Sequence, residues 1–273
     1  MKKRIAISVI ILLITAAAIC GYFFMREYVI AQEEIAVYTN IQDQYTTTTY
    51  VPTKEPDNNT PMPETEETPE ALIPYMNVDF EVLLQFNPDL VGWIAIPDTI
   101  ISYPVVQATD NVKYLTISFV GEYSKTGTPF ADMGNNMQNL DSNTIIYGHN
   151  MGNGRSDMFN TLLSYKDYSF MLANRFIQFD TIYERHGFWK VFAVIELDAN
   201  NTAFNYQQMQ FQSNAEFMEW ASMAMELSMH STETYVTPQE KVLALSTCDR
   251  SKYGQNGRFI ILAVQSDYGF TYG

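Results

Sequence analysis

Residues 241–264 read KVLALSTCDRSKYGQNGRFIILAV, and this stretch decides both the fold and the chemistry. Its two apolar runs, KVLALST and RFIILAV, flank a polar turn that contains Gly and Asn, the pattern of two neighbouring strands. Pairing across this turn would place Arg258, which begins the second run, beside Cys248, which follows the first. The stretch therefore predicts a thiol and a guanidinium at one end of a sheet.

Six more runs upstream have the same β-branched and aromatic character, with turn residues between them. Residues 184–187 (ERHG) resemble a hairpin turn. Eight short strands over residues 75–273 predict a mostly β domain, either a barrel or a sandwich, of single-domain size. The six upstream strands are VGWIAI (91–96), IISYPVV (100–106), TPFA (128–131), NTIIYG (143–148), RFIQFDTIY (175–183) and GFWKVFAVIEL (187–197).

Helical spacing of apolar residues occurs in two places within this domain. A short pattern covers residues 78–86, and SNAEFMEWASMAMELS (213–228) is the long one. A period of 3.6 residues gives this helix one apolar face, which we expect to pack on the core. The face consists of Phe217, Trp220, Ala221 and Met225.

The N-terminus carries a candidate membrane anchor. Residues 5–25 contain no charged residue, and as a helix they are about 31 Å long, enough to cross a bilayer core. A cleavable signal peptide has a shorter apolar region of about 7–15 residues, so the length favours an uncleaved anchor over residues 1–25. Because three cations precede the span (Lys2, Lys3 and Arg4), the N-terminus is expected in the cytoplasm and the rest of the chain outside the cell membrane.

Residues 26–74 are expected to form a stalk and a linker. Residues 26–45 can extend the helix, whereas residues 46–74 are dominated by Thr, Pro and Glu. Prolines end a helix, and acidic repulsion keeps such a segment extended. The sequence thus predicts an extended tether before an extracellular domain at residues 75–273.

Charge and cysteine content exclude several functions. With 16 Lys+Arg, 31 Asp+Glu and a net charge of −15, the chain is a poor ligand for nucleic acid. Its two cysteines make neither a disulfide scaffold nor a zinc motif, and no metal or cofactor is expected. Cys20 lies in the span, where we expect packing. A lipid-modified cysteine is the alternative, but Ile19 precedes it where a small residue is required.

Cys248 is the single thiol outside the span, and a nucleophilic thiol needs a nearby base or cation because its ordinary pKa is about 8.5. Three histidines could supply the base. His186 and His230 are expected on the solvated surface, in the hairpin turn and at the helix end. His149 follows strand 143–148, as Cys248 follows its own strand, and strand ends present side chains into clefts. Arg258 could stabilise an oxyanion, which completes a catalytic set.

Together, the motifs NTIIYGHNM, LALSTCDR and GRFIILAV resemble those of the sortases, membrane-anchored cysteine transpeptidases of Gram-positive bacteria. The YGHNM form, the STC triplet, the opening VGWIAIPDTIISYPVVQATDNVKYL and a long helix before the nucleophile strand are similar to class B. The resemblance covers residues 76–265.

The resemblance implies an eight-stranded sortase-type β-barrel with flanking helices, namely an N-terminal helix and a long helix before the nucleophile strand. It also implies that Cys248 attacks the threonine carbonyl of a sorting motif, similar to Asn-Pro-x-Thr-Asn or Ser-Pro-x-Thr-Gly, to form a thioacyl enzyme. His149 would act as acid and then as base, and Arg258 would hold the substrate and the oxyanion. The partners implied are surface proteins that bear the motif and a peptidoglycan amine. The implied groove residues are Asn111, Leu115, Tyr147 and Ser246.

Two other functions remain open from the sequence. In a surface cysteine peptidase, water would replace the amine. In a non-catalytic stalked scaffold, His149 and Cys248 would be structural. A papain-type site is disfavoured because its cysteine precedes its histidine in the chain, whereas here the histidine comes first.

Overall fold

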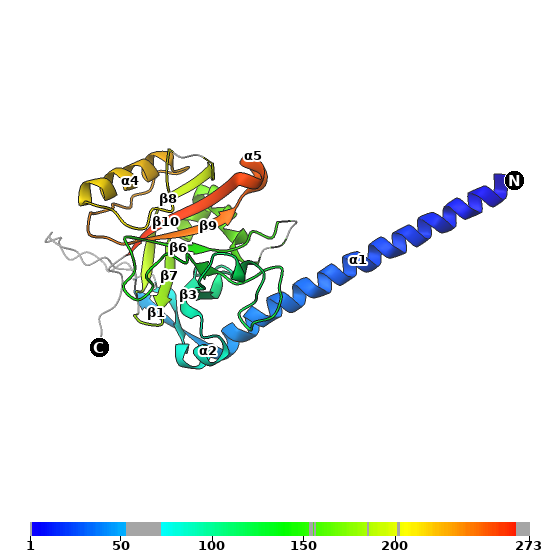
Figure 1. Cartoon of the computed structure of the whole chain (residues 1–273), viewed down its shortest axis with the longest axis horizontal. Coiled ribbons are helices and arrows are strands. Elements are labelled where there is room, and N and C mark those ends of the chain that lie inside the picture. The colour runs from blue at the N-terminus through cyan, green and yellow to red at the C-terminus, as the bar shows by residue number, and fades with distance from the viewer. Residues whose placement is uncertain are drawn as a thin grey trace, which may run out of the picture. The chain divides into compact units, whose positions relative to one another are not determined.

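The structure is a computed structural model that describes residues 2–52, 72–152, 155, 157–184, 186–200 and 203–265. The chain divides into two compact units, Met1–Gln44 and Tyr45–Gly273. The first unit is a single helix, α1 (Lys2–Tyr45), so the apolar segment does continue into the following residues as one helix (Figure 1). By length and composition α1 could cross a membrane, although an N-terminal signal sequence passes the same test.

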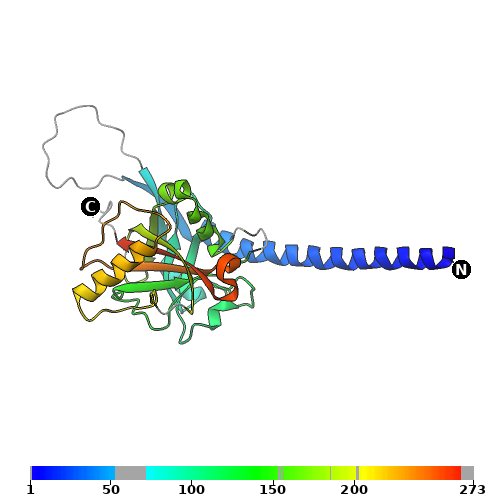
Figure 2. The same cartoon turned by 90° about the horizontal axis from the view of Figure 1, so that it is seen from above.

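Eight strands among the described residues of the second unit close into a barrel in the order β10-β8-β7-β3-β4-β5-β6-β9 (Figures 1 and 2). All eight predicted strands are confirmed, and the closed sheet decides for a barrel over a sandwich. The strands are β3 (Leu90–Ala95), β4 (Ser102–Val106), β5 (Phe130–Ala131), β6 (Asn143–Tyr147), β7 (Phe176–Thr181), β8 (Phe188–Asp198), β9 (Val242–Cys248) and β10 (Gly257–Gln265).

Strand β9, which ends at Cys248, has a different neighbour on each side. It pairs antiparallel with β10, with Arg258 opposite Cys248, as predicted. On its other side it runs parallel to β6, with Tyr147 opposite Ser246. The ends of β6 and β9 and the start of β10 therefore meet at one end of the barrel.

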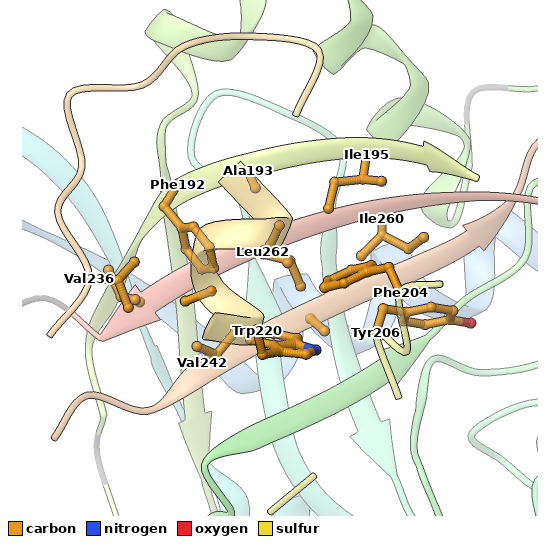
Figure 3. Close-up of a cluster of buried hydrophobic side chains, with 14 of the residues drawn as sticks. Phe192, Ala193, Ile195, Phe204, Tyr206, Trp220, Val236, Val242, Ile260 and Leu262 are labelled. Carbon is orange, nitrogen blue, oxygen red and sulfur yellow. The ribbon is translucent and has the colours of Figure 1, made fainter. Parts of the chain in front are cut away.

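Successive side chains of a strand point to opposite faces, and one face of β9 and β10 is covered by the helix α4 (Asn214–Leu227). The Ser213 side chain accepts a hydrogen bond from the Glu216 backbone N–H and so caps this helix. Figure 3 shows α4 laid across the strands, with Trp220 pointing into the cluster. The buried residues of the cluster on these three elements include Phe217, Trp220, Ala221, Ala224, Val242, Ala244, Ile260, Leu262 and Val264.

The predicted apolar face of the helix is wrong at one residue, Met225. Met225 is 37% exposed, and Ala224 is buried instead. Ala224 lies seven positions after Phe217, which is nearly two full turns, so it returns to the same stripe, whereas Met225 is rotated a further 100° away from it.

Short helices complete the second unit, and three of them begin at an aspartate. Asp79, Asp167 and Asp249 each accept a hydrogen bond from a backbone N–H of the first turn, which satisfies a donor that has no partner within the helix. The short helices are α2 (Phe80–Phe86), η1 (Lys113–Leu115), η2 (Phe159–Lys166), α3 (Tyr168–Ala173), α5 (Arg250–Tyr253) and η3 (Gly254–Asn256).

The prediction of an extended tether over residues 46–74 is wrong at both ends of that segment. Strands β1 (Thr46–Pro52) and β2 (Leu72–Val78) form a two-stranded antiparallel ribbon. Their β-branched and aromatic residues favour this pairing, and Tyr75 is fully buried with Phe176 and Phe188 of the barrel. The domain boundary expected at residue 75 thus falls inside a paired strand. Residues 53–71 lie outside the described residues.

A buried carboxylate joins this ribbon to the barrel. Asp180, 4% exposed, accepts hydrogen bonds from the Tyr75 hydroxyl at 2.5 Å, from Gln178 Nε2 at 2.8 Å and from the Gly187 backbone N–H at 2.9 Å. Nearby His186 is only 6% exposed, so the expectation of a solvated residue is wrong. Burial lowers the pKa of its imidazole, which favours the neutral form.

Candidate active site

A pocket of about 270 Å³ lies where β6, β9 and β10 meet, and Cys248, His149 and Arg258 line it. The four predicted groove residues, Asn111, Leu115, Tyr147 and Ser246, line the same pocket. The structure thus brings all seven candidates together around one cavity. The other lining residues are Phe130, Gly148, Ala199, Tyr206, Gln207 and Thr247.

The face of the pocket that carries Cys248 continues the face of β9 and β10 that packs under α4. Along β9, Val242 and Ala244 belong to that buried cluster, and because strand side chains alternate with a period of two, Ser246 and Cys248 follow on the same face. On β10 the residue opposite Cys248 is Arg258. Apolar residues thus give way to polar ones as β9 and β10 approach the pocket. Phe204 and Tyr206 lie at the opposite end of the cluster from Val236 (Figure 3).

Hydrogen bonds hold the segments after β6 and β9 against each other. The Thr247 hydroxyl donates to the Gly148 carbonyl at 2.7 Å, and Asn150 Nδ2 donates to the Cys248 carbonyl at 2.8 Å. Gly148 has no room for a side chain, because a Cβ there would lie 2.5 Å from the Phe159 ring. The position of His149, next in the chain, therefore depends on this close contact.

The ring of His149 is held by one backbone group. Its Nε2 lies 2.8 Å from the carbonyl oxygen of Leu115. A carbonyl oxygen only accepts hydrogen bonds, so Nε2 carries a proton in this arrangement. Nδ1 is then the ring nitrogen left for a bond to a ligand.

Backbone carbonyls hold one branch of the Arg258 guanidinium. Nη1 donates to the carbonyls of Gln255 and Gly257 at 3.2 and 3.0 Å, and the donors on Nη2 and Nε can serve a ligand. Burial raises the pKa of the neighbouring Tyr206 hydroxyl, and a hydrogen bond with Ser246 and the charge of Arg258 lower it in part. A fixed cation, a thiol and an imidazole thus surround one cavity.

Tyr206 and Gln207 reach the pocket from the segment between β8 and α4, and they were missed in the sequence. Long-range bonds hold this segment: Asn143 Nδ2 donates to the Tyr206 and Gln208 carbonyls at 2.8 and 2.9 Å, and Trp220 Nε1 donates to the Asn205 carbonyl at 2.8 Å. Such contacts leave no local pattern in the sequence.

The remaining histidine lies elsewhere. His230 is half-buried rather than solvated, with Nε2 2.8 Å from the Tyr165 carbonyl, and it does not line the pocket. In the described part of the chain, no three or more His, Cys, Asp or Glu side chains form a group that could hold a metal ion. The groups that the pocket does offer suit acyl transfer: a nucleophile, a proton carrier and an oxyanion donor.

Comparisons with known proteins agree with this chemistry. The family model described as the Sortase domain matches residues 94–266. The chain is 28% identical to Sortase B of Staphylococcus aureus over 96% of both chains, and 35% identical to Sortase B of Listeria monocytogenes over 66% of this chain and 70% of that protein.

Solved structures show the same similarity. A Staphylococcus aureus sortase B–substrate complex superposes with a TM-score of 0.62 at 31% identity, over 68% of this chain and 83% of that one. Sortase B from Listeria monocytogenes gives a TM-score of 0.59 at 32% identity, over 67% of this chain and 98% of that one.

Proposed function

The chain belongs to the sortase family as a class B transpeptidase, and from this premise we propose that Cys248, His149 and Arg258 are its catalytic residues. Their convergence on one pocket carries the proposal. The Cys248 thiolate attacks the threonine carbonyl of a sorting motif. The peptide C–N bond breaks as the thioester forms, and His149 protonates the leaving amine.

In the second half of the reaction an amine replaces the thiol. His149 removes a proton from the incoming amine, which attacks the thioester and releases the Cys248 thiolate. Because a thioester retains much of the free energy of the cleaved bond, no ATP is needed. Arg258 donates to the oxyanion in both steps. The motif proposed resembles Asn-Pro-x-Thr-Asn or Ser-Pro-x-Thr-Gly, and the acceptor is a peptidoglycan amine.

Mass spectrometry of the acyl-enzyme tests this assignment. Full-length protein in detergent is incubated with peptides that carry each motif, with and without an amine acceptor. We expect a mass increase on Cys248 and, with the amine, a ligated product. Cys248→Ala should abolish both, whereas Cys20→Ala is the matched control and should retain them. A Cys248→Ala variant that processes the peptide as well as wild type would overturn the assignment of Cys248 as the nucleophile. Hydrolysis unaffected by the amine would indicate a peptidase, and a wild-type protein that processes no peptide would leave the scaffold function.

The membrane anchor is part of the same proposal. A segment of α1 has the length and hydropathy of a span, and the three preceding cations favour a cytoplasmic N-terminus. In intact cells, a membrane-impermeant maleimide should then label Cys248 but leave Cys20 unlabelled. Labelling of Cys248 only after lysis would contradict the proposed extracellular location.

A further inference from the structure

Asp132 follows strand β5, whose Phe130 lines the pocket, and lies behind the pocket wall. Its carboxylate is 6% exposed. Oδ2 accepts hydrogen bonds from Asn111 Nδ2 at 2.9 Å and from the Tyr147 hydroxyl at 2.8 Å, while Oδ1 accepts one from the Gly134 backbone N–H at 2.9 Å. All three partners donate, which suits an ionised carboxylate. Two of them, Asn111 and Tyr147, line the pocket.

These bonds continue across the pocket wall. Gln207 Nε2 donates to the Tyr147 hydroxyl at 2.7 Å, and the Met133 backbone N–H donates to Asn111 Oδ1 at 2.8 Å. Asp132 thus connects three separate parts of the wall: the turn before η1, the end of β6 and the segment before α4.

The direction of each bond decides what the wall offers to a ligand. The Tyr147 hydroxyl donates to Asp132 and accepts from Gln207, so its hydrogen-bonding capacity is largely used, and its ring is what remains for a ligand. The Asn111 amide cannot be flipped, because Met133 can only donate to it and Asp132 can only accept from it. One N–H of Asn111 is held by Asp132, and the other can donate to a ligand.

We propose that Asp132 is a positioning residue that fixes Asn111 as a hydrogen-bond donor to a backbone carbonyl of the bound peptide, and holds Tyr147 and Gln207 as a rigid wall. The inference rests on the proposed function, because it takes the pocket to be the site where the sorting peptide binds. Loss of the carboxylate would leave Asn111 free to rotate, and binding the peptide would then require ordering it again.

The test is steady-state kinetics of peptide processing by the full-length protein in detergent. Asp132→Asn puts an amide against three donors and breaks at least one bond. We expect KM to rise about fivefold to tenfold, with kcat reduced by much less, and the rate of Cys248 alkylation by iodoacetamide within about twofold of wild type. Asp180→Asn is the matched control, since Asp180 also accepts from a tyrosine, an amide and a glycine N–H, and its KM should stay within about twofold.

A double variant separates positioning from general damage. If Asp132 acts through Asn111, adding Asp132→Asn to Asn111→Ala should raise KM little further, whereas independent effects would multiply. If Asp132→Asn does not fold, Asp132→Glu keeps the charge but displaces both oxygens, and it should raise KM in the same way.

The outcomes are distinct for the two proposals. An unchanged KM in folded Asp132→Asn, or multiplied effects in the double variant, would overturn the positioning role while wild-type transfer upholds the proposed function. A wild-type protein that processes neither motif would overturn both.

Discussion

Two buried carboxylates of the second unit accept nearly the same set of hydrogen bonds, but one lies at the pocket and the other under the ribbon. Asp132 and Asp180 each accept hydrogen bonds from a tyrosine hydroxyl, a side-chain amide and a glycine backbone N–H. Two partners of Asp132, Asn111 and Tyr147, line the pocket that holds Cys248, whereas the tyrosine partner of Asp180 belongs to the ribbon that packs on the barrel. The same bonding pattern therefore supports ligand recognition at one place and folding at the other.

The largest expected effect is at the pocket. Arg258→Lys removes the planar fork that we propose donates to the oxyanion, and we expect kcat/KM to fall about 100-fold with little change in unfolding free energy. Peptide-transfer kinetics measure the first quantity and urea unfolding the second. Arg175→Lys, an exposed change directly before β7, should alter neither. If Arg258→Lys lowers the unfolding free energy as strongly as it lowers transition-state stabilisation, activity at the pocket and stability of the second unit cannot be changed separately.

The converse effect, a loss of stability with activity retained, is expected at Asp180, which joins the ribbon to the barrel. Asp180→Asn leaves buried donors without an acceptor, which costs about 1–3 kcal/mol. Urea unfolding should show this loss while the KM for the peptide is retained. If Asp180→Asn instead weakens peptide binding, the contrast between the two carboxylates is broken.

Gly148→Ala should lower both stability and activity, because Gly148 packs against the Phe159 ring and also lines the pocket. The added Cβ would press on the Phe159 ring, an overpacking that costs about 1–3 kcal/mol, and relief of the clash would move His149. Thermal unfolding and the pH profile of kcat/KM would record the two effects. Gly21→Ala is the control, since no atom lies within 4 Å of the place its Cβ would take. An unchanged pH profile would show that His149 tolerates the shift.

The smallest effect concerns Asp249, next to Cys248. Burial on its own would raise the pKa of this carboxyl, but hydrogen bonds from Lys166, at 2.5 Å, and from Ser251 outweigh it and lower the pKa. A carboxyl with a lowered folded-state pKa stabilises the fold above its unfolded pKa of about 3.9, and this contribution is lost as the pH falls through the folded-state value.

Lys166→Gln should therefore cost less than about 1 kcal/mol near neutral pH, and the difference from wild type should vanish well below pH 4. Urea unfolding at several pH values measures it. Lys252→Gln removes an exposed charge from the neighbouring α5 and should show no such dependence. A difference that persists in acid would mean that Lys166 acts through packing alone.

Much of the architecture could be predicted from local patterns. The turn between β9 and β10 indicated antiparallel pairing, and that pairing put Arg258 opposite Cys248. The matching positions of His149 and Cys248 at strand ends suggested that they share a cleft, and the parallel pairing of β6 with β9 brings them to one pocket.

The rest depends on contacts between distant residues. Asp132 stands in an unremarkable run, and its importance arises from Asn111 and Tyr147, which are 21 and 15 residues away. Tyr206 is placed by Asn143, a residue of another strand. The Thr-rich run of β1 precedes Pro- and Glu-rich residues, a composition typical of a linker, and the burial of Tyr75 against the barrel shows why that region nevertheless pairs.

The ribbon also changes what the acidic segment can do. Pro52 and Leu72 are partners in its ladder of seven residue pairs, so residues 53–71 leave and rejoin the domain at the same place. Their number therefore does not set how far Tyr45 lies from the barrel. An insertion or a deletion between Pro52 and Leu72 would therefore leave that distance unchanged while the ribbon stays paired. A single proteolytic cut would leave two fragments held together by the ribbon.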